Sequence, residues 1–270
     1  MSLSTLITLI IIFFVTSVIG VVTGSNSLIT VPVMFQLGID EKTAIATNMF
    51  GLTFMAVGGA IPFLRKGTVN VRSLSPMIVL TVIGSAIGAA IVGVITNEAI
   101  KMIVTIAMFA IVIFTLVTGN GRRDMSEEEE ENHPDRETRP PLLRKEGSFL
   151  SPIGYILVFL LAIYGGLYSG GYVTVLTAAL VAFFGMTYKR SIASTKVINI
   201  FSSGVATLVF IYQGLVNFYL GILIGITMFV GAYIGAHIAL KLHERVLRLI
   251  FYSAVLLLAV KMLFDLLNGS

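Results

Sequence analysis

The sequence has few charged residues and no cysteine. Only 12% of its 270 residues are charged, whereas 56% are hydrophobic and the mean hydropathy is +0.96. An average soluble domain has about 25% charged residues, so this chain has too few to cover a soluble surface. A polytopic membrane protein is the class that fits. The absence of cysteine excludes disulfides, zinc–thiolate sites, iron–sulfur clusters and cysteine nucleophiles.

Motifs that carry enzymatic chemistry are also missing. The sequence contains no HExxH, no phosphate-binding Walker loop and no GxSxG, so hydrolytic or nucleotide-driven chemistry has no visible machinery. No Asp or Glu lies well inside an expected span, and Asp265 lies near the end of the last one, which disfavours a carboxylate proton pump or an acidic-ring channel. A lone histidine in a span, such as His237, more commonly bonds a backbone group than relays protons. We therefore expect no catalytic residue, no metal site and no cofactor.

Hydrophobicity divides the chain into two halves separated by a charged segment. We expect a first transmembrane repeat at 1–118, a cytoplasmic linker at 119–149 and a second transmembrane repeat at 150–270. Nearly half of the charged residues fall in the linker, including the run Glu127–Glu131. Such a composition cannot build a core, so a solvated linker is expected, and a partner-binding tail is the alternative.

An offset of 147 residues aligns the two halves without a gap. The offset brings Gly24 onto Gly171 and Gly38 onto Gly185. Shared hydrophobicity alone does not produce matched glycines, so the pattern indicates an internal repeat. The same offset pairs Thr30 with Thr177, Ala46 with Ala193, Phe54 with Phe201, Gly67–Asn70 with Gly214–Asn217, Gly84 with Gly231, Gly88 with Gly235, and Lys101 with Arg248.

Each half is expected to open with a broken pair of short apolar segments. The segments 3–19 and 27–38, and likewise 150–165 and 172–185, are shorter than the roughly 20 residues that cross a bilayer. They are joined through glycine-rich runs, and glycine costs about 1 kcal/mol relative to alanine inside a helix. Matching breaks in two halves point to a transporter binding site. Long spans are expected at 43–64, 73–96, 99–118, 190–212, 217–240 and 246–267.

The distribution of basic residues predicts the topology. If each broken pair is a hairpin that returns to its starting side, most of the 18 basic residues lie on one side of the membrane. If each pair crosses once, the basic residues divide between the sides, so the positive-inside rule favours hairpins. The fold expected is an all-α polytopic membrane protein of two inverted-topology repeats, each a broken, re-entrant helical hairpin plus three transmembrane helices. The termini would lie outside the plasma (inner) membrane and the central loop in the cytoplasm.

The two breaks are the strongest candidates for a site. A helix that begins inside the membrane at Ser25-Asn26-Ser27, and another near Tyr172–Thr174, would present free backbone N–H groups and a dipole that favours anions. Irregular backbone at this depth is tolerated only within protein or beside a water-filled cavity. Close helix packing is the alternative role of glycine, and it suits Gly84, Gly88, Gly231 and Gly235 better.

The third segment of the second half has a polar face. Lys196, Asn199, Ser203 and Thr207 are spaced by three, four and four residues, which is helical periodicity. Lys196 either faces a cavity or extends to the interface, since Lys189 lies only about 10 Å away along the helix. The residues expected to bind substrate are Gly24, Ser25, Asn26, Thr47, Asn48, Gly170, Gly171, Ser194, Thr195, Lys196 and Asn199.

Several of these segments carry a family resemblance. The run Gly24–Pro32, the loop at Gly38, the stretch Ala44–Asn48 and the loop Gly67–Val69 resemble the sulfite exporter TauE/SafE family of membrane permeases. The resemblance covers the chain outside 119–149. It implies export or uptake of sulfite, thiosulfate, sulfonates and related organosulfur anions. The chain differs from the family in having Ser25-Asn26-Ser27 where more glycine is usual, and Lys196 where a neutral residue is commoner.

The leading hypothesis is a secondary transporter for a small anion, such as a sulfur oxyanion or sulfonate, that works by alternating access between two repeats. Its partners would be the anionic substrate and membrane lipid. The pI near 9.3 does not indicate nucleic acid, because cytoplasmic loops are basic anyway. One alternative is an intramembrane enzyme acting on a lipid or small apolar substrate, with His237 and Lys196 as its acid–base groups. Another is an assembly partner that contacts other proteins through the charged loop. The oligomeric state is left open.

Overall fold

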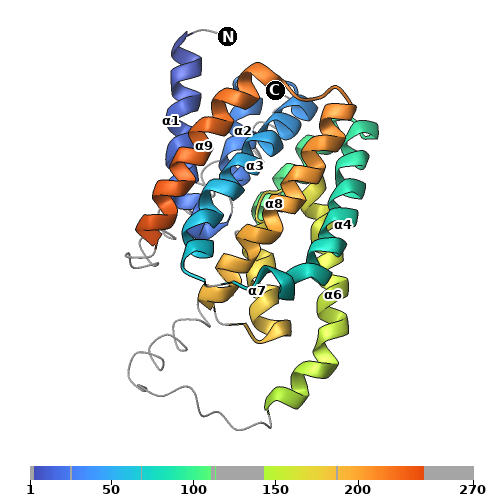
Figure 1. The fold of residues 1–270 in the computed structure, drawn as a ribbon. Helices are drawn as coiled ribbons and strands as arrows, with labels where there is room; N and C mark the ends of the chain where they lie inside the picture. The colour runs from blue at the N-terminus through green and yellow to red at the C-terminus, as the bar shows by residue number, and fades with distance from the viewer. Residues whose placement is uncertain are drawn as a thin grey trace.

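The computed structural model describes residues 3–24, 26–67, 69–110, 113, 143–186 and 188–239. Every regular element in this part of the chain is a helix, so the expectation of an all-α protein is confirmed (Figure 1). The first half contains α1 (Leu3–Thr23), α2 (Ser27–Gln36), α3 (Glu41–Arg65), the 3-10 helix η1 (Val71–Leu74) and α4 (Ser75–Val94), and residues 97–110 are also helical. The second half contains α6 (Leu143–Leu167), α7 (Tyr172–Phe184), α8 (Tyr188–Tyr212) and α9 (Phe218–Ala239).

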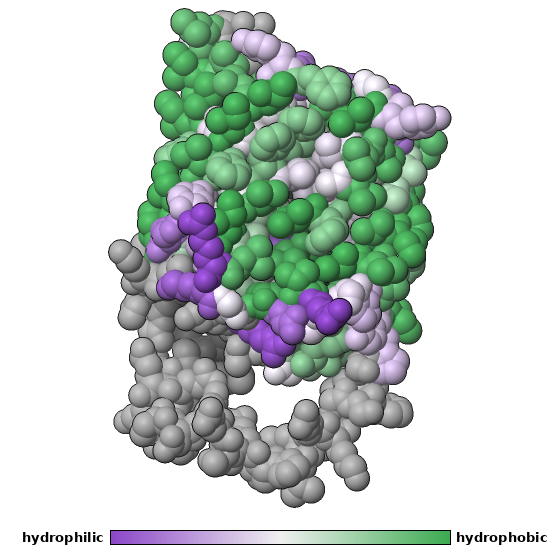
Figure 2. Space-filling view, viewed as in Figure 1, coloured by the Kyte–Doolittle hydropathy of each residue, from purple (hydrophilic) through white to green (hydrophobic). Residues whose placement is uncertain are grey.

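The composition and surface of these helices are those of a multi-pass membrane protein. Large apolar side chains cover the outside, and Ile11, Val79 and Ile226 are each more than half exposed. Figure 2 shows a broad hydrophobic surface with strongly hydrophilic side chains gathered along its lower margin. Lipid chains can cover such a belt, whereas water cannot do so without cost. Five of the described helices can cross a membrane by length and composition: Leu3–Val21, Glu41–Arg65, Val71–Val94, Arg190–Tyr212 and Phe218–Ile238.

Two helix boundaries in the broken pairs differ from the prediction, namely the end of α1 and the start of α6. The second helix of each pair is short as expected, with 10 residues in α2 and 13 in α7. However, α1 continues through Gly20 to Thr23, and its 21 residues are enough for a span of their own. Gly20 lies within this helix, and its missing side chain leaves room for Asn26 and Met55. The helix α6 begins at Leu143, inside the segment expected to be a linker, because Leu, Arg, Lys and Glu are good helix formers.

The repeat is visible in the backbone conformation. All the described glycines with positive φ fall into three pairs 147 residues apart, and we call residues at this separation repeat mates. Positive φ is a conformation that favours glycine, so each pair marks the same turn in both halves. The pairs are Gly24 (77°) and Gly171 (78°), Gly38 (77°) and Gly185 (60°), and Gly67 (65°) and Gly214 (70°).

The two halves interlock rather than lie side by side. The helix α4 packs on α6 and α8, and α9 correspondingly packs on α1 and α3. In Figure 1 the first helices of the two halves run in opposite directions, since α1 begins at the top of the view and α6 at the bottom. This arrangement supports the inverted relation of the repeats, which stays a prediction.

Glycines permit the closest of these contacts. A Cβ on Gly88 would meet the backbone of Ile163 in α6, and a Cβ on Gly235 would meet the backbone of Val18 in α1. A Cβ on Gly84 or on Gly231 would likewise come within 2.8 Å of α6 or α1, respectively. The packing role expected for these four glycines is therefore confirmed.

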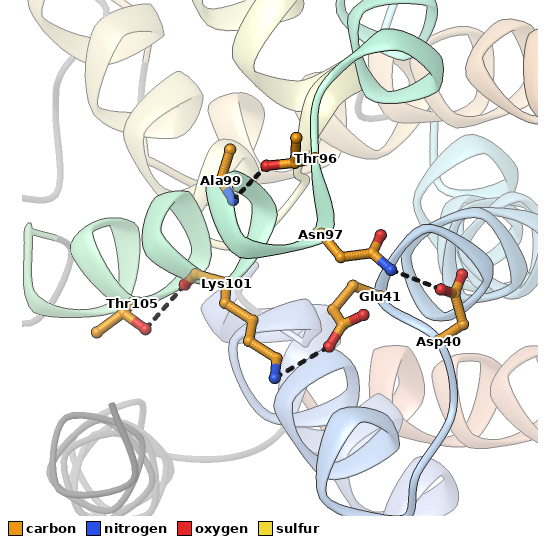
Figure 3. A network of polar contacts seen from close by, with 7 residues as sticks. All are labelled: Asp40, Glu41, Thr96, Asn97, Ala99, Lys101 and Thr105. Carbon is orange, nitrogen blue, oxygen red and sulfur yellow. Dashed lines mark hydrogen bonds and ion pairs between the residues drawn. The ribbon is translucent and has the colours of Figure 1, made fainter. Parts of the chain in front are cut away.

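A polar network ties the turn between α2 and α3 to the segment after α4 (Figure 3). Asp40 caps α3 by accepting the Thr43 backbone N–H at 3.0 Å, and it accepts the Asn97 amide at 2.8 Å. Glu41 pairs with Lys101 at 3.2 Å. Partial burial raises the pKa of Asp40, but hydrogen bonds from Thr43 and Asn97 outweigh it, so the pKa lies below its ordinary value. The network fixes the position of the turn.

Candidate functional site

The two breaks touch each other inside the protein. The Ser27 hydroxyl at the start of α2 lies 2.7 Å from the Ser169 hydroxyl in the break between α6 and α7. The Tyr168 hydroxyl donates to the Ser27 carbonyl at 3.0 Å. From the other side, the Thr174 hydroxyl of α7 donates to the carbonyl of Thr23 at 2.6 Å. The N-terminal ends of α2 and α7 are therefore held together.

Glycines shape this junction. A Cβ on Gly24 would lie 2.8 Å from the Val173 side chain and 3.0 Å from the Thr174 nitrogen. The space that Gly24 leaves open thus receives the first turn of α7, which differs from the expectation that an anion would fill it. In the other break, Gly170 packs against the Tyr168 ring, and Gly171 caps α7 in a left-handed conformation.

A small cavity lies beside the junction. The space open to the centre of a water molecule is about 20 Å³, which is enough for a water-sized molecule. Four of the residues expected to bind substrate line it, namely Gly24, Asn26, Lys196 and Asn199. The full lining is Gly20, Val21, Gly24, Asn26, Ser27, Leu52, Met55, Ala56, Ser169, Val173, Lys196 and Asn199.

Lys196 is the one charged side chain in the described lining of the cavity. It is 4% exposed, and its ammonium donates one long hydrogen bond, 3.4 Å, to the Gly20 carbonyl. No carboxylate pairs with it among the described residues, where the ion pair found is that of Lys101 with Glu41. Of the two orientations left open by the sequence, this position favours the cavity over the interface.

Two amides flank this lysine. The Asn26 amide nitrogen donates to the Ser17 hydroxyl at 3.4 Å and to the Met55 sulfur at 3.3 Å, while its oxygen is buried without a partner. Turning the amide over would let Ser17 donate to the oxygen and would leave the NH₂ group available as a donor. The Asn199 side chain lines the cavity, and no described residue hydrogen-bonds to its amide. Both amides can therefore serve a ligand.

Other predicted residues lie behind the cavity lining. Asn48 donates to the Ser27 hydroxyl at 2.9 Å and accepts from the Thr30 hydroxyl at 2.7 Å, so it holds the break from outside. Its repeat mate Thr195 stands 3.4 Å from Thr177, the mate of Thr30. This shared contact indicates that these two positions support the breaks in both halves.

The remaining predicted residues do not reach the cavity. Thr47 accepts the backbone N–H of Asn217 at 3.0 Å, which anchors the turn before α9. The Ser194 hydroxyl is buried without a partner. Gly170 and Gly171 shape the break without lining the cavity. The prediction for Ser25 lies outside the described residues.

Sequence reasoning missed two hydroxyls of the junction. Ser27 and Ser169 each lie in or beside a glycine-rich run, and they contact each other across the two halves. A hydroxyl within a run that breaks a helix competes for backbone groups and often sits at the helix end. Their positions within matching breaks were the available signal.

His237 is separate from this site. Its ring nitrogen Nδ1 lies 2.9 Å from the Tyr233 carbonyl one turn earlier, and the side chain does not line the cavity. The expectation that it bonds a backbone group is confirmed. An acid–base pair of His237 with Lys196, which the enzymatic alternative needs, is not formed.

Comparisons with known proteins identify the group to which the chain is similar. Residues 9–262 match the family described as Sulfite exporter TauE/SafE. The chain is 24% identical over 255 residues to the Probable membrane transporter protein ORF9 of Sinorhizobium sp, which covers 93% of this chain and 90% of that protein. It is 25% identical over 252 residues to a Probable membrane transporter protein of Haemophilus influenzae, with coverage of 93% and 92%. It is 23% identical over 259 residues to the Probable membrane transporter protein YfcA of Escherichia coli strain K12, with coverage of 94% and 89%.

No solved structure matches the chain significantly. The family match includes both breaks and all the residues that line the cavity. The names of the family and of the relatives are those of transporters, so the chain is a membrane transporter and not an enzyme. The chain belongs to the Sulfite exporter TauE/SafE family.

Proposed function

We propose that this protein is a secondary transporter for a small anion, a sulfur oxyanion or sulfonate such as sulfite. The observation that carries the proposal is Lys196, a lysine buried in a cavity with no acidic partner among the described residues. An unpaired charge inside a membrane protein is costly, and a bound anion would supply the missing counter-charge. The family description supports a sulfur-containing substrate, whereas the residues of the cavity do not identify sulfur.

The helix ends at the breaks provide further attraction for an anion. The helices α2 and α7 both begin beside the cavity, and the positive end of a helix dipole favours negative charge. We assign direct contact with the substrate to Asn26, Lys196 and Asn199. We assign supporting roles around the cavity to Gly24, Thr47, Asn48, Gly170, Gly171, Ser194 and Thr195.

Transport would proceed by alternating access to a site that both repeats form. The cavity admits only a water-sized molecule, so binding of a larger anion requires the surrounding helices to separate. We place the protein in the inner membrane with both termini outside and the linker 119–149 in the cytoplasm. The basic residues near Arg65 and Lys189, together with the opposite directions of α1 and α6, support this orientation.

Counterflow tests the proposal. Proteoliposomes loaded with unlabelled sulfite are diluted into a trace of labelled sulfite, and a carrier will accumulate the label transiently by exchange. An enzyme would convert sulfite instead, and an assembly partner would do neither. Protein-free vesicles measure leakage. Absence of exchange for both sulfite and methanesulfonate would refute anion transport.

A further inference from the structure

The described lining of the cavity contains one cationic side chain, Lys196, and no acidic one. No carboxylate lies within ion-pair distance of this lysine in the described part of the chain. The formal charge that a ligand must bring to neutralise the side chains of this lining is therefore a single negative charge.

We infer that the site selects anions by valence, accepting those with one negative charge and rejecting those with two. This inference rests on the proposed function. A singly charged anion and the Lys196 ammonium form a neutral pair in the protein interior. A doubly charged anion would leave one negative charge unpaired there, and its lost hydration would not be repaid.

The uncharged side chains of the lining also support selection against a doubly charged anion with many oxygens. Asn26 and its repeat mate Val173 both line the cavity, as do Asn199 and its repeat mate Leu52. Each pair of mates thus contributes one amide and one aliphatic side chain. Hydrogen-bond donors can cover only part of a ligand, and the rest meets hydrocarbon. A buried oxygen without a donor is unfavourable.

The ligand that fits this lining combines oxygens with an apolar group. A sulfonate has three oxygens, one carbon substituent and one charge. Sulfite that has taken up one proton also carries one charge. Sulfate has four equivalent oxygens and two charges, so it fails on both grounds.

Two tetrahedral competitors test the inference without any mutation. Methanesulfonate carries one charge and sulfate two, and both are included in counterflow of labelled sulfite at one pH. We expect methanesulfonate to halve the exchange at a concentration about tenfold or more below that of sulfate. Equal competition, or stronger competition by sulfate, would overturn valence selection while leaving anion transport intact.

The pH dependence of sulfite exchange gives a second measurement. With equal pH on both sides of the membrane, exchange should fall as rising pH removes the proton from singly charged sulfite. Methanesulfonate keeps one charge throughout, so its exchange over the same range reports any titration of the protein itself. A sulfite profile that parallels the methanesulfonate profile would contradict the inference.

Two variants locate the selectivity. Lys196→Gln should remove the advantage of methanesulfonate over sulfate. Leu52→Lys adds a second cation to the lining at the repeat mate of Asn199. It should shift the preference toward sulfate by about tenfold. Unchanged competitor ratios in folded, exchanging Lys196→Gln protein would refute the assignment to this lysine, and the wild-type comparison stands on its own if Leu52→Lys does not fold.

Discussion

Lys196 is the residue on which the proposed function depends most. Its ammonium has a single long hydrogen bond to a backbone carbonyl, so most of its bonding capacity is unused. A charge-assisted hydrogen bond to an anion contributes about 1.5–3 kcal/mol. Because 1.4 kcal/mol corresponds to a factor of ten in binding, this one contact can dominate affinity.

Substitutions at Lys196 should rank by charge. Lys196→Ala should weaken the apparent affinity roughly ten- to a hundredfold, since the charge-assisted bond is lost. Lys196→Arg should retain part of the affinity because charge remains while geometry changes, and Lys196→Glu should be worse than alanine. Initial uptake against substrate concentration, at matched protein amounts, measures these values. Equal half-saturation concentrations across the three variants would remove Lys196 from the site.

The sequence predicted the polar face of the second half better than that of the first. Lys196 and Asn199 share a helical face, and both line the cavity. Their repeat mates are Met49 and Leu52, which are apolar, so polarity directed the prediction to Thr47 and Asn48 instead. Helical periodicity shows which residues share a face, and the structure shows which face meets the cavity.

Transport should be more sensitive to substitution of the glycine in the break between α1 and α2 than to substitution of a glycine with the same conformation in a turn. Gly24 and Gly38 both have φ of 77°, but a Cβ on Gly38 would meet nothing within 4 Å, whereas one on Gly24 would strike Val173. Alanine in this conformation costs about 1–2 kcal/mol at either position. We expect Gly38→Ala to transport at near-normal rates and Gly24→Ala to lose most transport. Initial uptake at equal protein amount in the membrane measures both.

Equal losses in Gly24→Ala and Gly38→Ala would mean that backbone conformation alone matters. They would exclude a specific requirement for contact between the two breaks.

The cap of α3 should make stability depend on pH at the acidic end. The pKa of Asp40 is depressed in the folded protein, so its contribution is present above the unfolded pKa and is lost as pH falls through the folded pKa. Asp40→Ala should lower stability by roughly 0.5–1 kcal/mol near neutral pH, and the difference from wild type should shrink on acidification. Thermal unfolding of purified protein over a pH series measures this.

Asp40→Asn is the matched control, because asparagine caps helices without titrating. A difference between wild type and Asp40→Ala that stays constant through acid pH would contradict the role of the carboxylate.

The sequence predicted helix boundaries correctly where the conformation of glycine determines them. The short helices α2 and α7 begin after glycines with positive φ, and a glycine-rich run signals such a break. The predicted end of α1 was wrong by several residues, because the helix continues through Gly20, whose missing side chain leaves room for Asn26. Tertiary packing of this kind overrides intrinsic propensity and leaves no local pattern in the sequence.

At the scale of the whole molecule, the orientation in the membrane is directly testable. A reporter that is active only in the cytoplasm should be active when inserted within residues 125–140 and silent when fused after Ser270. The reason is that the proposed hairpin topology places most basic residues on the side of the linker. Activity at both places would refute the inverted arrangement and the hairpins on which it depends.

The repeat was visible in the sequence, but the interlocking of the halves was not. An offset of 147 residues identifies equivalent positions such as Gly88 and Gly235. It does not reveal that Gly88 packs on α6 and Gly235 on α1, each in the opposite half. Equivalence of positions is a local property, whereas the choice of packing partner follows from the arrangement of all the helices.

The interlocked glycine contacts have a mechanical consequence. Backbone packed on backbone cannot slide easily, so α9 should move with α1, and α4 should move with α6. Because the chain lacks cysteine, pairs introduced at Ser85 and Ser202, or at Ser27 and Ser169, can be oxidised without background; each pair of hydroxyls is 2.7 Å apart.

We expect α8, which packs on α4, to move with it. Cross-linking of Ser85→Cys to Ser202→Cys joins these two helices and should therefore leave transport largely intact. Cross-linking of Ser27→Cys to Ser169→Cys joins the two breaks across the bodies and should arrest transport until a reductant is added. Arrest by both links, or by neither, would contradict this division. If the two cross-links behave as expected, each rigid body of the transport cycle contains helices from both repeats. The unit that moves then differs from the unit that was duplicated.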